Sequence, residues 1–164
     1  AGAVVALDPR NVQVLVLGSF PAYDPNSFSG RFDRKQWQLL VNDDKHPLSN
    51  RAIQGRYAPG STFKVVVAAA ALEQELVTPE TEMHCSGAVR LYGNVYKCHR
   101  ASGHGAVNLI QALAQSCNSY FFQLGVKLQI ELLARYGKMF GLGALTGIDL
   151  PHEVSGLVPD PAWK

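Results

Sequence analysis

A hydroxyl group and an amine lie three residues apart at Ser61 and Lys64. Pro59 and Gly60 precede them and form a turn that a helix interior would not tolerate, and an apolar run follows. The sequence therefore predicts a helix that starts near Ser61. Because side chains at positions i and i+3 share one face of a helix, Ser61 and Lys64 should be able to touch. This pattern indicates a serine nucleophile with a lysine as its base.

Lys64 can accept a proton only while it is neutral. Desolvation and the positive end of the helix dipole both disfavour its charged form. Backbone N–H groups at the same helix end could stabilise an oxyanion. A serine at a helix start is, however, usually only an N-cap, and Ser-x-x-Lys also occurs by chance. A second element is needed before the pattern indicates catalysis.

The second element is Ser116-Cys117-Asn118. The residues before it predict a helix over 108–115, with Asn108 as N-cap. Ser116 and Asn118 then lie at the junction with the next helix, where polar side chains can project into a cleft. The residues expected to face the core are Leu109, Ile110 and Leu113.

Ser-x-x-Lys followed by Ser-x-Asn is typical of penicillin-binding proteins and related β-lactamases. The chain resembles the class B penicillin-binding proteins, most closely the elongation-type group called penicillin-binding protein 2. The resemblance extends over nearly the whole chain. The matching segments are 3–9, 19–26, 50–52, 57–64, 103–105, 116–122, 140–143 and 146–151.

The resemblance implies a peptidoglycan D,D-transpeptidase that is a target of penicillin. Ser61 would attack the D-alanyl-D-alanine carbonyl of a stem peptide, with Lys64 as general base. Ser116 would relay a proton between Lys64 and the leaving or attacking nitrogen, and Asn118 would hydrogen-bond the peptide of the substrate. An amine of a neighbouring stem would then resolve the ester, whereas β-lactams would leave Ser61 acylated. This chemistry needs no cofactor.

The family's third motif, Lys-Thr-Gly or Lys-Ser-Gly on a strand, has no match. Thr146-Gly147 follows Leu145 in a context typical of a loop. The resemblance places the third motif beyond Lys164. We therefore expect residues 1–164 to be the first part of a transpeptidase domain, and its activity without the third motif is an open question.

The sequence predicts an α/β fold, which the resemblance identifies as an incomplete transpeptidase fold of the penicillin-binding protein and serine β-lactamase type. Residues 1–20 should form a hairpin of the central sheet, from strands 4–7 and 12–17. An irregular connection with a short helix near 34–40 should follow over 21–60. Residues 61–164 should form a helical subdomain with both motifs. Its expected helices are 61–75, 108–115, 118–126 and 129–139.

Composition limits the classes of partner. The formal net charge is +2, and the sequence contains no basic cluster, which gives no reason to expect nucleic acid binding. No run approaches the ~18 apolar residues of a membrane span. The resemblance implies an extracytoplasmic domain on the periplasmic face of a bacterial inner membrane. It also implies an N-terminal anchor that precedes this sequence and an elongation-complex glycosyltransferase as partner.

Cys85, Cys98 and Cys117 are the only cysteines, and His104 lies between flanking glycines. Thiolates and imidazole are the usual ligands of structural zinc, so the four residues are a candidate zinc site that would fix the backbone of the second motif. Some members of the resembled group hold zinc just ahead of that motif. The alternatives are a Cys85–Cys98 disulfide or free thiols. His84 and His99 are alternative ligands.

Two other functions stay open at this point. Ser-x-x-Lys is shared with class D β-lactamases and β-lactam sensors. In that group, however, the second motif resembles Ser-x-Val, so Asn118 argues against this function. The other is an inactive scaffold of the elongation complex. The presence of all four candidate catalytic residues argues against a scaffold.

Overall fold

The computed structural model of the protein describes residues 1–30 and 33–163. The chain forms two compact units. The first consists of Ala1–Tyr57 and Gly147–Ser155, and the second consists of Ala58–Thr146 and Gly156–Lys164. Among the described residues, no helix is both long enough and apolar enough to cross a membrane.

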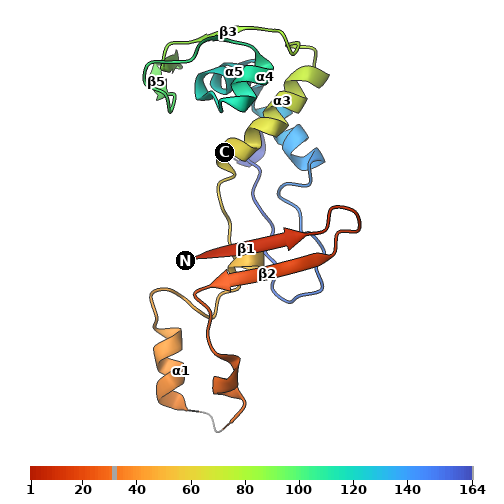
Figure 1. Ribbon diagram of the computed structural model, residues 1–164. Helices are drawn as coiled ribbons and strands as arrows, with labels where there is room; N and C mark the ends of the chain where they lie inside the picture. The colour runs from red at the N-terminus through yellow and green to blue at the C-terminus, as the bar shows by residue number, and fades with distance from the viewer. Residues whose placement is uncertain (31–32, 164) are drawn as a thin grey trace. The chain divides into compact units, whose positions relative to one another are not determined.

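An antiparallel hairpin is the main element of the first unit (Figure 1). Strand β1 (Gly2–Leu7) pairs with β2 (Val14–Phe20), and a bulge interrupts the register after Ala6. The predicted hairpin is confirmed, but its second strand begins later than expected. Val12 has a φ of 61° and belongs to the connection, because this left-handed conformation cannot continue a strand.

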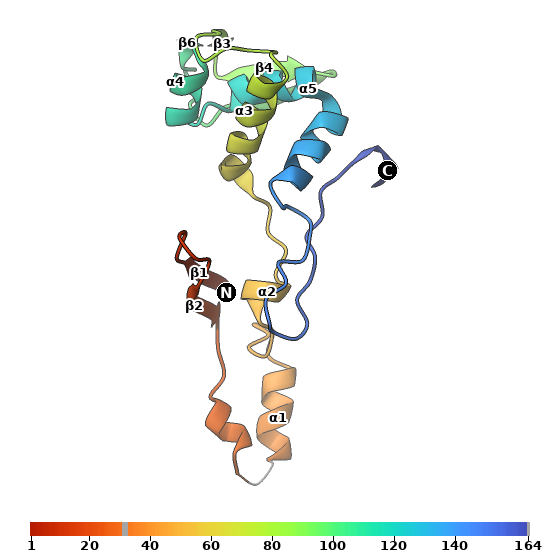
Figure 2. The same ribbon diagram turned by 90° about the vertical axis from the view of Figure 1, so that its right-hand side faces the viewer.

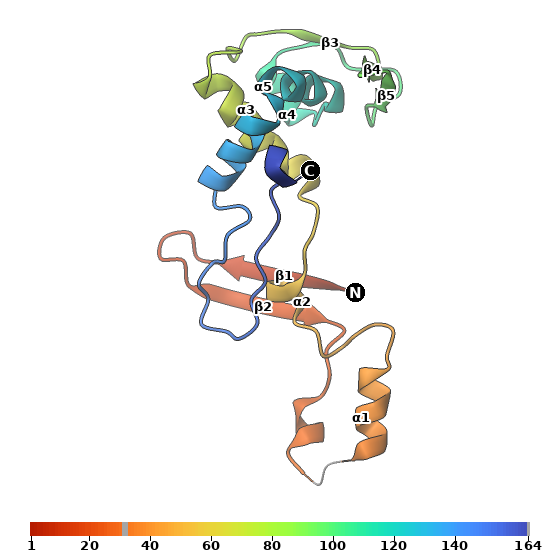
Figure 3. The same cartoon turned by 180° about the vertical axis from the view of Figure 1, so that it is seen from behind.

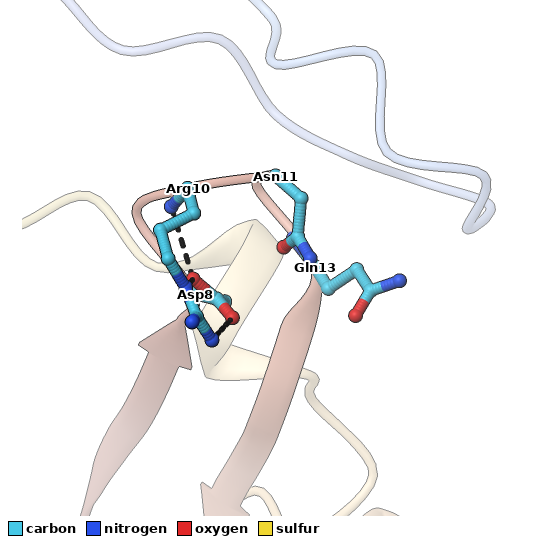
Figure 4. A network of polar contacts seen from close by, with 4 residues as sticks. All are labelled: Asp8, Arg10, Asn11 and Gln13. Atoms are coloured by element: carbon cyan, nitrogen blue, oxygen red, sulfur yellow. Dashed lines mark hydrogen bonds and ion pairs between the residues drawn. The ribbon is translucent and has the colours of Figure 1, made fainter.

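The carboxylate of Asp8 closes the connection of the hairpin (Figure 4). It accepts hydrogen bonds from the backbone N–H of Arg10 at 2.9 Å and from the Arg10 guanidinium at 3.0 and 2.7 Å. The side-chain oxygen of Asn11 accepts from the N–H of Gln13 at 3.0 Å. Such local bonds from Asp and Asn side chains stabilise a reversal of the chain.

Two short helices follow the hairpin. The 3-10 helix η1 (Pro25–Phe28) precedes α1 (Arg34–Val41), which matches the helix expected near 34–40. Asp33 caps α1 because its carboxylate accepts from the N–H groups of the first turn.

Helix α2 (Arg51–Gln54) packs against β1 and β2. The hydroxyl of Ser19, at the end of β2, accepts from the N–H of Arg51 at 3.0 Å and donates to the carbonyl of Ser49 at 2.8 Å. A single partly buried hydroxyl therefore joins the hairpin to the start of α2. The returning segment joins the same helix, since the N–H of Val154 donates to the carbonyl of Ile53.

The core of the second unit lies between α3 (Lys64–Glu73) and α5 (Asn118–Met139), which Figure 2 shows beside each other. Ala70 and Ala71 are fully buried on α3, and their small side chains let the two helices approach closely. Leu124 is fully buried on the facing helix. The 3-10 helix η3 (Pro161–Trp163) begins after Asp160, whose carboxylate pairs with Lys138 of α5 at 2.8 Å.

Two details differ from the expected helices. The α-helix begins at Lys64 and not near Ser61, because the 3-10 helix η2 (Gly60–Phe63) precedes it. Asn108 caps α4 (Leu109–Ala114) as expected, in a reciprocal capping box with Gln111. Only Leu109 of the three apolar residues is buried, however, since Ile110 is 63% exposed and Leu113 is 38% exposed.

Helix α5 contains a break at Gln129, which has a φ of 62°. The break agrees with the two separate helices expected on either side of it.

Four short strands were not predicted (Figure 3). Strand β3 (Met83–Cys85) pairs with β6 (Gly105–Val107), and β4 (Ala88–Leu91) pairs with β5 (Asn94–Lys97). Strands β3, β4 and β5 contact α5. Strands of three or four residues are too short to carry a readable alternation of apolar and polar positions. The second unit is therefore not purely helical.

Leu124→Ala should lower the free energy of unfolding by about 2–5 kcal/mol, because it leaves a cavity in the contact between α3 and α5. Ile110→Ala removes a similar side chain from an exposed position and should change stability by about 0.5 kcal/mol or less. Urea unfolding followed by circular dichroism measures both. Equal losses for the two variants would contradict this assignment of the core.

Candidate functional site

Ser61 lies in η2, one turn before the start of α3. Gly60 has a φ of 56°, a conformation that glycine adopts without strain, and it turns the chain into this segment. The N–H of Lys64 donates to the carbonyls of Ser61 and Thr62, which holds the turn. Ser61 is exposed, as an attacking group must be.

The amine of Lys64 makes three hydrogen bonds. It donates to the carbonyl of Ser116 at 2.7 Å, to the hydroxyl of Ser116 at 3.0 Å and to Oδ1 of Asn118 at 2.7 Å. A lysine ammonium has three donors and no acceptor, so these contacts use all of its capacity. The first and second motifs, more than 50 residues apart in sequence, thus meet at one nitrogen.

Ser116 also joins Lys64 to Ser61. Its hydroxyl donates to the hydroxyl of Ser61 at 3.0 Å. Among the residues that the structure describes, Ser61 and Lys64 are connected through Ser116 and make no direct hydrogen bond with each other. Proton transfer between Ser61 and Lys64 can therefore run through the oxygen of Ser116.

The backbone at Ser116 is in a conformation that serine rarely adopts, with a φ of 52°. Ser116 follows α4, and its N–H donates to the carbonyl of Leu113, while the N–H of Cys117 donates to Ala112. These bonds hold the strained residue so that its carbonyl and its hydroxyl both face Lys64. Strain of this kind persists only where the surrounding structure over-determines it.

Burial lowers the pKa of Lys64 below its usual value, because desolvation disfavours the ammonium form. The nearby Cys117 and Cys98 act in the opposite direction and raise it. The ring of Phe121 lies 5.5 Å from the amine. A lysine with a lowered pKa is neutral more often than an exposed one, as a general base requires.

Cys85, Cys98, His104 and Cys117 lie together in the second unit, with their ligand atoms all within 4.8 Å of one another. Nδ1 of His104 is 3.5 Å from the sulfur of Cys85 and 3.6 Å from that of Cys98. Cys85 ends β3, Cys98 follows β5, His104 precedes β6 and Cys117 is the N-cap residue of α5. Four separate segments therefore contribute one donor each to a group that could hold a metal ion.

Close backbone contacts at two glycines make this convergence possible. A Cβ on Gly103 would lie 2.1 Å from the carbonyl oxygen of Cys85, and one on Gly87 would lie 2.0 Å from that of Ala101. Both glycines have positive φ values, 77° and 94°. Only glycine fits at such contacts, so these two positions bring the loop of Cys98 and His104 against β3. The sequence analysis noted Gly103 only as a neighbour of His104 and gave no role to Gly87.

The thiols differ in acidity. Burial raises the pKa of Cys85, but hydrogen bonds from Ser119, Gly87, His104 and Cys117 bring it down to about 7. Burial also raises the pKa of Cys98, and the N–H groups of Arg100, Ser119 and Asn118 lower it below its usual value. Burial and the charges of the other two thiolates raise the pKa of Cys117 to about 11. Three thiolates at this spacing therefore require a nearby cation.

Ser119 is fully buried beside these thiols. Its side chain, as a hydrogen-bond donor, lowers the pKa of the Cys85 thiol. Yet no hydrogen-bond partner of ordinary geometry for it is found among residues 1–30 and 33–163. Leaving a buried hydroxyl unsatisfied costs about 1–3 kcal/mol. The sequence analysis gave no role to Ser119, and its place directly after Asn118 was the only signal.

The alternative ligands and the alternative disulfide can now be compared with the geometry. His84 neighbours Cys85 on β3, so its side chain points to the other face of the strand. The ring of His99 lies beside that of His104, tilted by 57° with centroids 5.1 Å apart, and its Nδ1 lies 3.9 Å from the sulfur of Cys98. All three cysteines are free thiols. The donor set, three buried sulfurs and one imidazole, is chemically suited to zinc.

Thr146 and Gly147 lie outside the described strands. The N–H of Gly147 donates to the Glu153 carboxylate at 3.2 Å, and its φ is 78°. This loop geometry differs from that of a catalytic motif on a strand.

Residues 2–164 match the family model described as penicillin binding protein transpeptidase domain. The peptidoglycan D,D-transpeptidase MrdA of Acinetobacter baumannii is 39% identical over 99% of this chain and 25% of that protein. The chain spans about a quarter of the length of the MrdA relatives that it matches.

Solved structures agree with this match. Penicillin-binding protein 2 of Helicobacter pylori, in its complex with MreC, is 35% identical with a TM-score of 0.93, over 99% of this chain and 30% of that one. Penicillin-binding protein A of M. tuberculosis, as its penicillin G acyl-enzyme, is 32% identical with a TM-score of 0.84, over 99% and 40%. Both the family and the fold expected from the sequence are confirmed. The chain belongs to the penicillin-binding protein transpeptidase domain family.

Proposed function

We propose that this chain carries the nucleophile, the base and the proton relay of a serine-type peptidoglycan D,D-transpeptidase. The observation that carries the proposal is the continuous set of hydrogen bonds from Ser61 through Ser116 to Lys64 and on to Asn118. The names of the relatives, D,D-transpeptidases and a penicillin G acyl-enzyme, support the same reaction class.

In the acylation step, the oxygen of Ser61 forms a bond with the carbonyl carbon of the penultimate D-alanine of a stem peptide. The proton of Ser61 passes to the oxygen of Ser116, which gives its own proton to neutral Lys64. The bond to the terminal D-alanine then breaks, and the proton returns from Lys64 through Ser116 to the leaving nitrogen. The amine of a neighbouring stem reverses these steps and forms the cross-link.

Asn118 orients both the lysine and the substrate. Its Oδ1 accepts from Lys64, and its Nδ2 lies 3.5 Å from the carbonyl of Lys97. The second contact is long, so this N–H can turn toward the peptide carbonyl of a bound stem. A β-lactam presents a similar carbonyl, and its ring opening leaves the acyl group on Ser61.

Location and partners follow from this reaction. Peptidoglycan lies outside the inner membrane, so we place the domain on the periplasmic face, joined to the membrane by an anchor elsewhere in the protein. The complex of the Helicobacter pylori relative with MreC supports a role in a multiprotein elongation complex. A glycosyltransferase that polymerises the glycan strands is the partner whose product this reaction would cross-link.

We also propose that Cys85, Cys98, His104 and Cys117 hold a structural zinc ion. Zinc would supply the positive charge that three close thiolates require. Cys117 lies between Ser116 and Asn118, so a fixed sulfur at this residue holds the backbone from which both side chains project. Acyl transfer itself uses only the four candidate catalytic residues.

Lys64→Met should slow acylation by benzylpenicillin by about 100–10,000-fold, the usual contribution of a general base. The measurement is the rate of penicilloyl adduct formation by mass spectrometry, on a chain extended through the third motif. Lys127→Met, on an exposed part of α5, is the matched control and should acylate normally. Ser61→Ala should form no adduct.

An adduct that forms on Ser61 but is lost rapidly would favour a β-lactamase. The absence of any adduct in the unaltered chain would favour a scaffold.

The acylation rate should depend on pH through Lys64. The base must be neutral, so the rate should rise as pH increases through the pKa of Lys64 and then level off. Because burial lowers this pKa, the midpoint should lie below 10.5, the value of an exposed lysine. Stopped-flow acylation between neutral and alkaline pH gives the midpoint. A midpoint at or above the value of an exposed lysine would contradict the role of burial.

Native mass spectrometry should find one zinc ion per chain. His104→Ala should abolish zinc binding because it removes one of four donors, whereas His84→Ala changes a histidine on the other face of β3 and should keep the metal. A zinc-free chain lighter by two hydrogen atoms would instead indicate the Cys85–Cys98 disulfide. A zinc-free chain of full thiol mass would indicate free thiols.

A further inference from the structure

The buried hydroxyl of Ser119 lacks a hydrogen-bond partner of ordinary geometry among the residues described in the structure. The residues around it indicate a role for this hydroxyl. The first two turns of α5 run along β3 and the residues before it. The hydroxyl of Tyr120 donates to the carbonyl of Thr81 at 2.9 Å, and Nε2 of Gln123 lies 3.4 Å from the carbonyl of His84. Ser119 is four residues before Gln123 and therefore on the same face of α5, next to Cys85.

Ser119 acts on two of the four candidate zinc ligands. Its side chain lowers the pKa of the Cys85 thiol, and its backbone N–H lowers the pKa of the Cys98 thiol, as hydrogen-bond donors near a sulfur do. Cys85 is 1% exposed and Ser119 is fully buried, so no solvent competes for this hydroxyl. A neutral thiol is a weak acceptor, whereas a metal-bound thiolate is a strong one. The hydroxyl is thus positioned for a bond that a thiolate would complete.

We propose that Ser119 is a positioning residue of the cluster, whose hydroxyl donates to the Cys85 thiolate when a metal ion is bound. This inference rests on the zinc site proposed above and extends it to a residue that binds no metal itself. Ser119 directly follows Asn118, so the same turn of α5 carries a catalytic side chain and a hydrogen bond to a ligand. The bond would fix the direction of the Cys85 sulfur and thereby the distance between β3 and the start of α5.

The test is zinc affinity, measured by competition with a chromogenic chelator on the zinc-loaded chain extended through the third motif. Ser119→Ala should weaken zinc binding by about 10–100-fold, the usual effect of losing a partner of a metal ligand. Ser86→Ala is the matched control, because Ser86 neighbours Cys85 but its exposed hydroxyl donates to the carbonyl of Ala88. The control should bind zinc as the unaltered chain does. Equal affinities for all three proteins would overturn the inference.

A second measurement separates a hydrogen bond from a general loss of stability. With Co²⁺ as the probe, the thiolate-to-metal charge-transfer band should move to lower energy in Ser119→Ala, because an unbonded thiolate gives up its electron more readily. Looser folding alone would reduce the amount of bound Co²⁺ without moving the band, and this result would also overturn the inference.

The two proposals fail in different ways. If the unaltered chain binds neither Zn²⁺ nor Co²⁺, the metal site and the role of Ser119 are both wrong, while acylation of Ser61 still tests the transpeptidase. If the metal binds and Ser119→Ala changes nothing, only the role of Ser119 is wrong.

Discussion

The contact between the Lys64 amine and the Ser116–Asn118 segment is the interaction on which the candidate site depends. It joins positions 52 and 54 residues apart through three hydrogen bonds to one nitrogen. Because the amine is partly buried, each missing acceptor would leave a donor unsatisfied, so the two motifs must stay in register. The packing of α3 on α5 sets the distance between them, and the small side chains of Ala70 and Ala71 make that distance short.

The second motif is held from both sides. Its N-terminal side is fixed by α4, whose last turn accepts the N–H groups of Ser116 and Cys117. Its C-terminal side opens α5, whose first turn faces the thiols of Cys85 and Cys98. Between them, Ser116 adopts a positive φ that an unsupported serine would leave. The cysteine–histidine cluster thus supports the same short segment that carries the candidate catalytic side chains of Ser116 and Asn118.

Local signals predicted much of this arrangement. Proline and glycine before Ser61, the capping residue Asn108 and the hairpin composition around Asp8 each act within a few residues, and each can be read from the sequence. The burial of Ile110 was predicted wrongly because helical spacing alone cannot tell which face of a six-residue helix meets the core. Strands β3 and β6 were missed because they pair between segments that are distant in sequence, and β4 and β5 because each is too short to show an alternation of apolar and polar residues. The bridge from Ser61 through Ser116 likewise depends on tertiary packing.

The three cysteines and His104 lie farther apart in sequence than the ligands of a zinc finger, and the backbone shows how they nevertheless meet. Zinc-finger spacings are short because a single turn must present two ligands. Here Gly87 and Gly103 let two backbone segments cross at distances that exclude any Cβ, so Cys98 and His104 reach Cys85 from a distant loop. A substitution at either glycine would separate the ligands while leaving all four in the sequence. The cysteines and the histidine therefore determine which donor atoms are present, and Gly87 and Gly103 allow these donor atoms to come together.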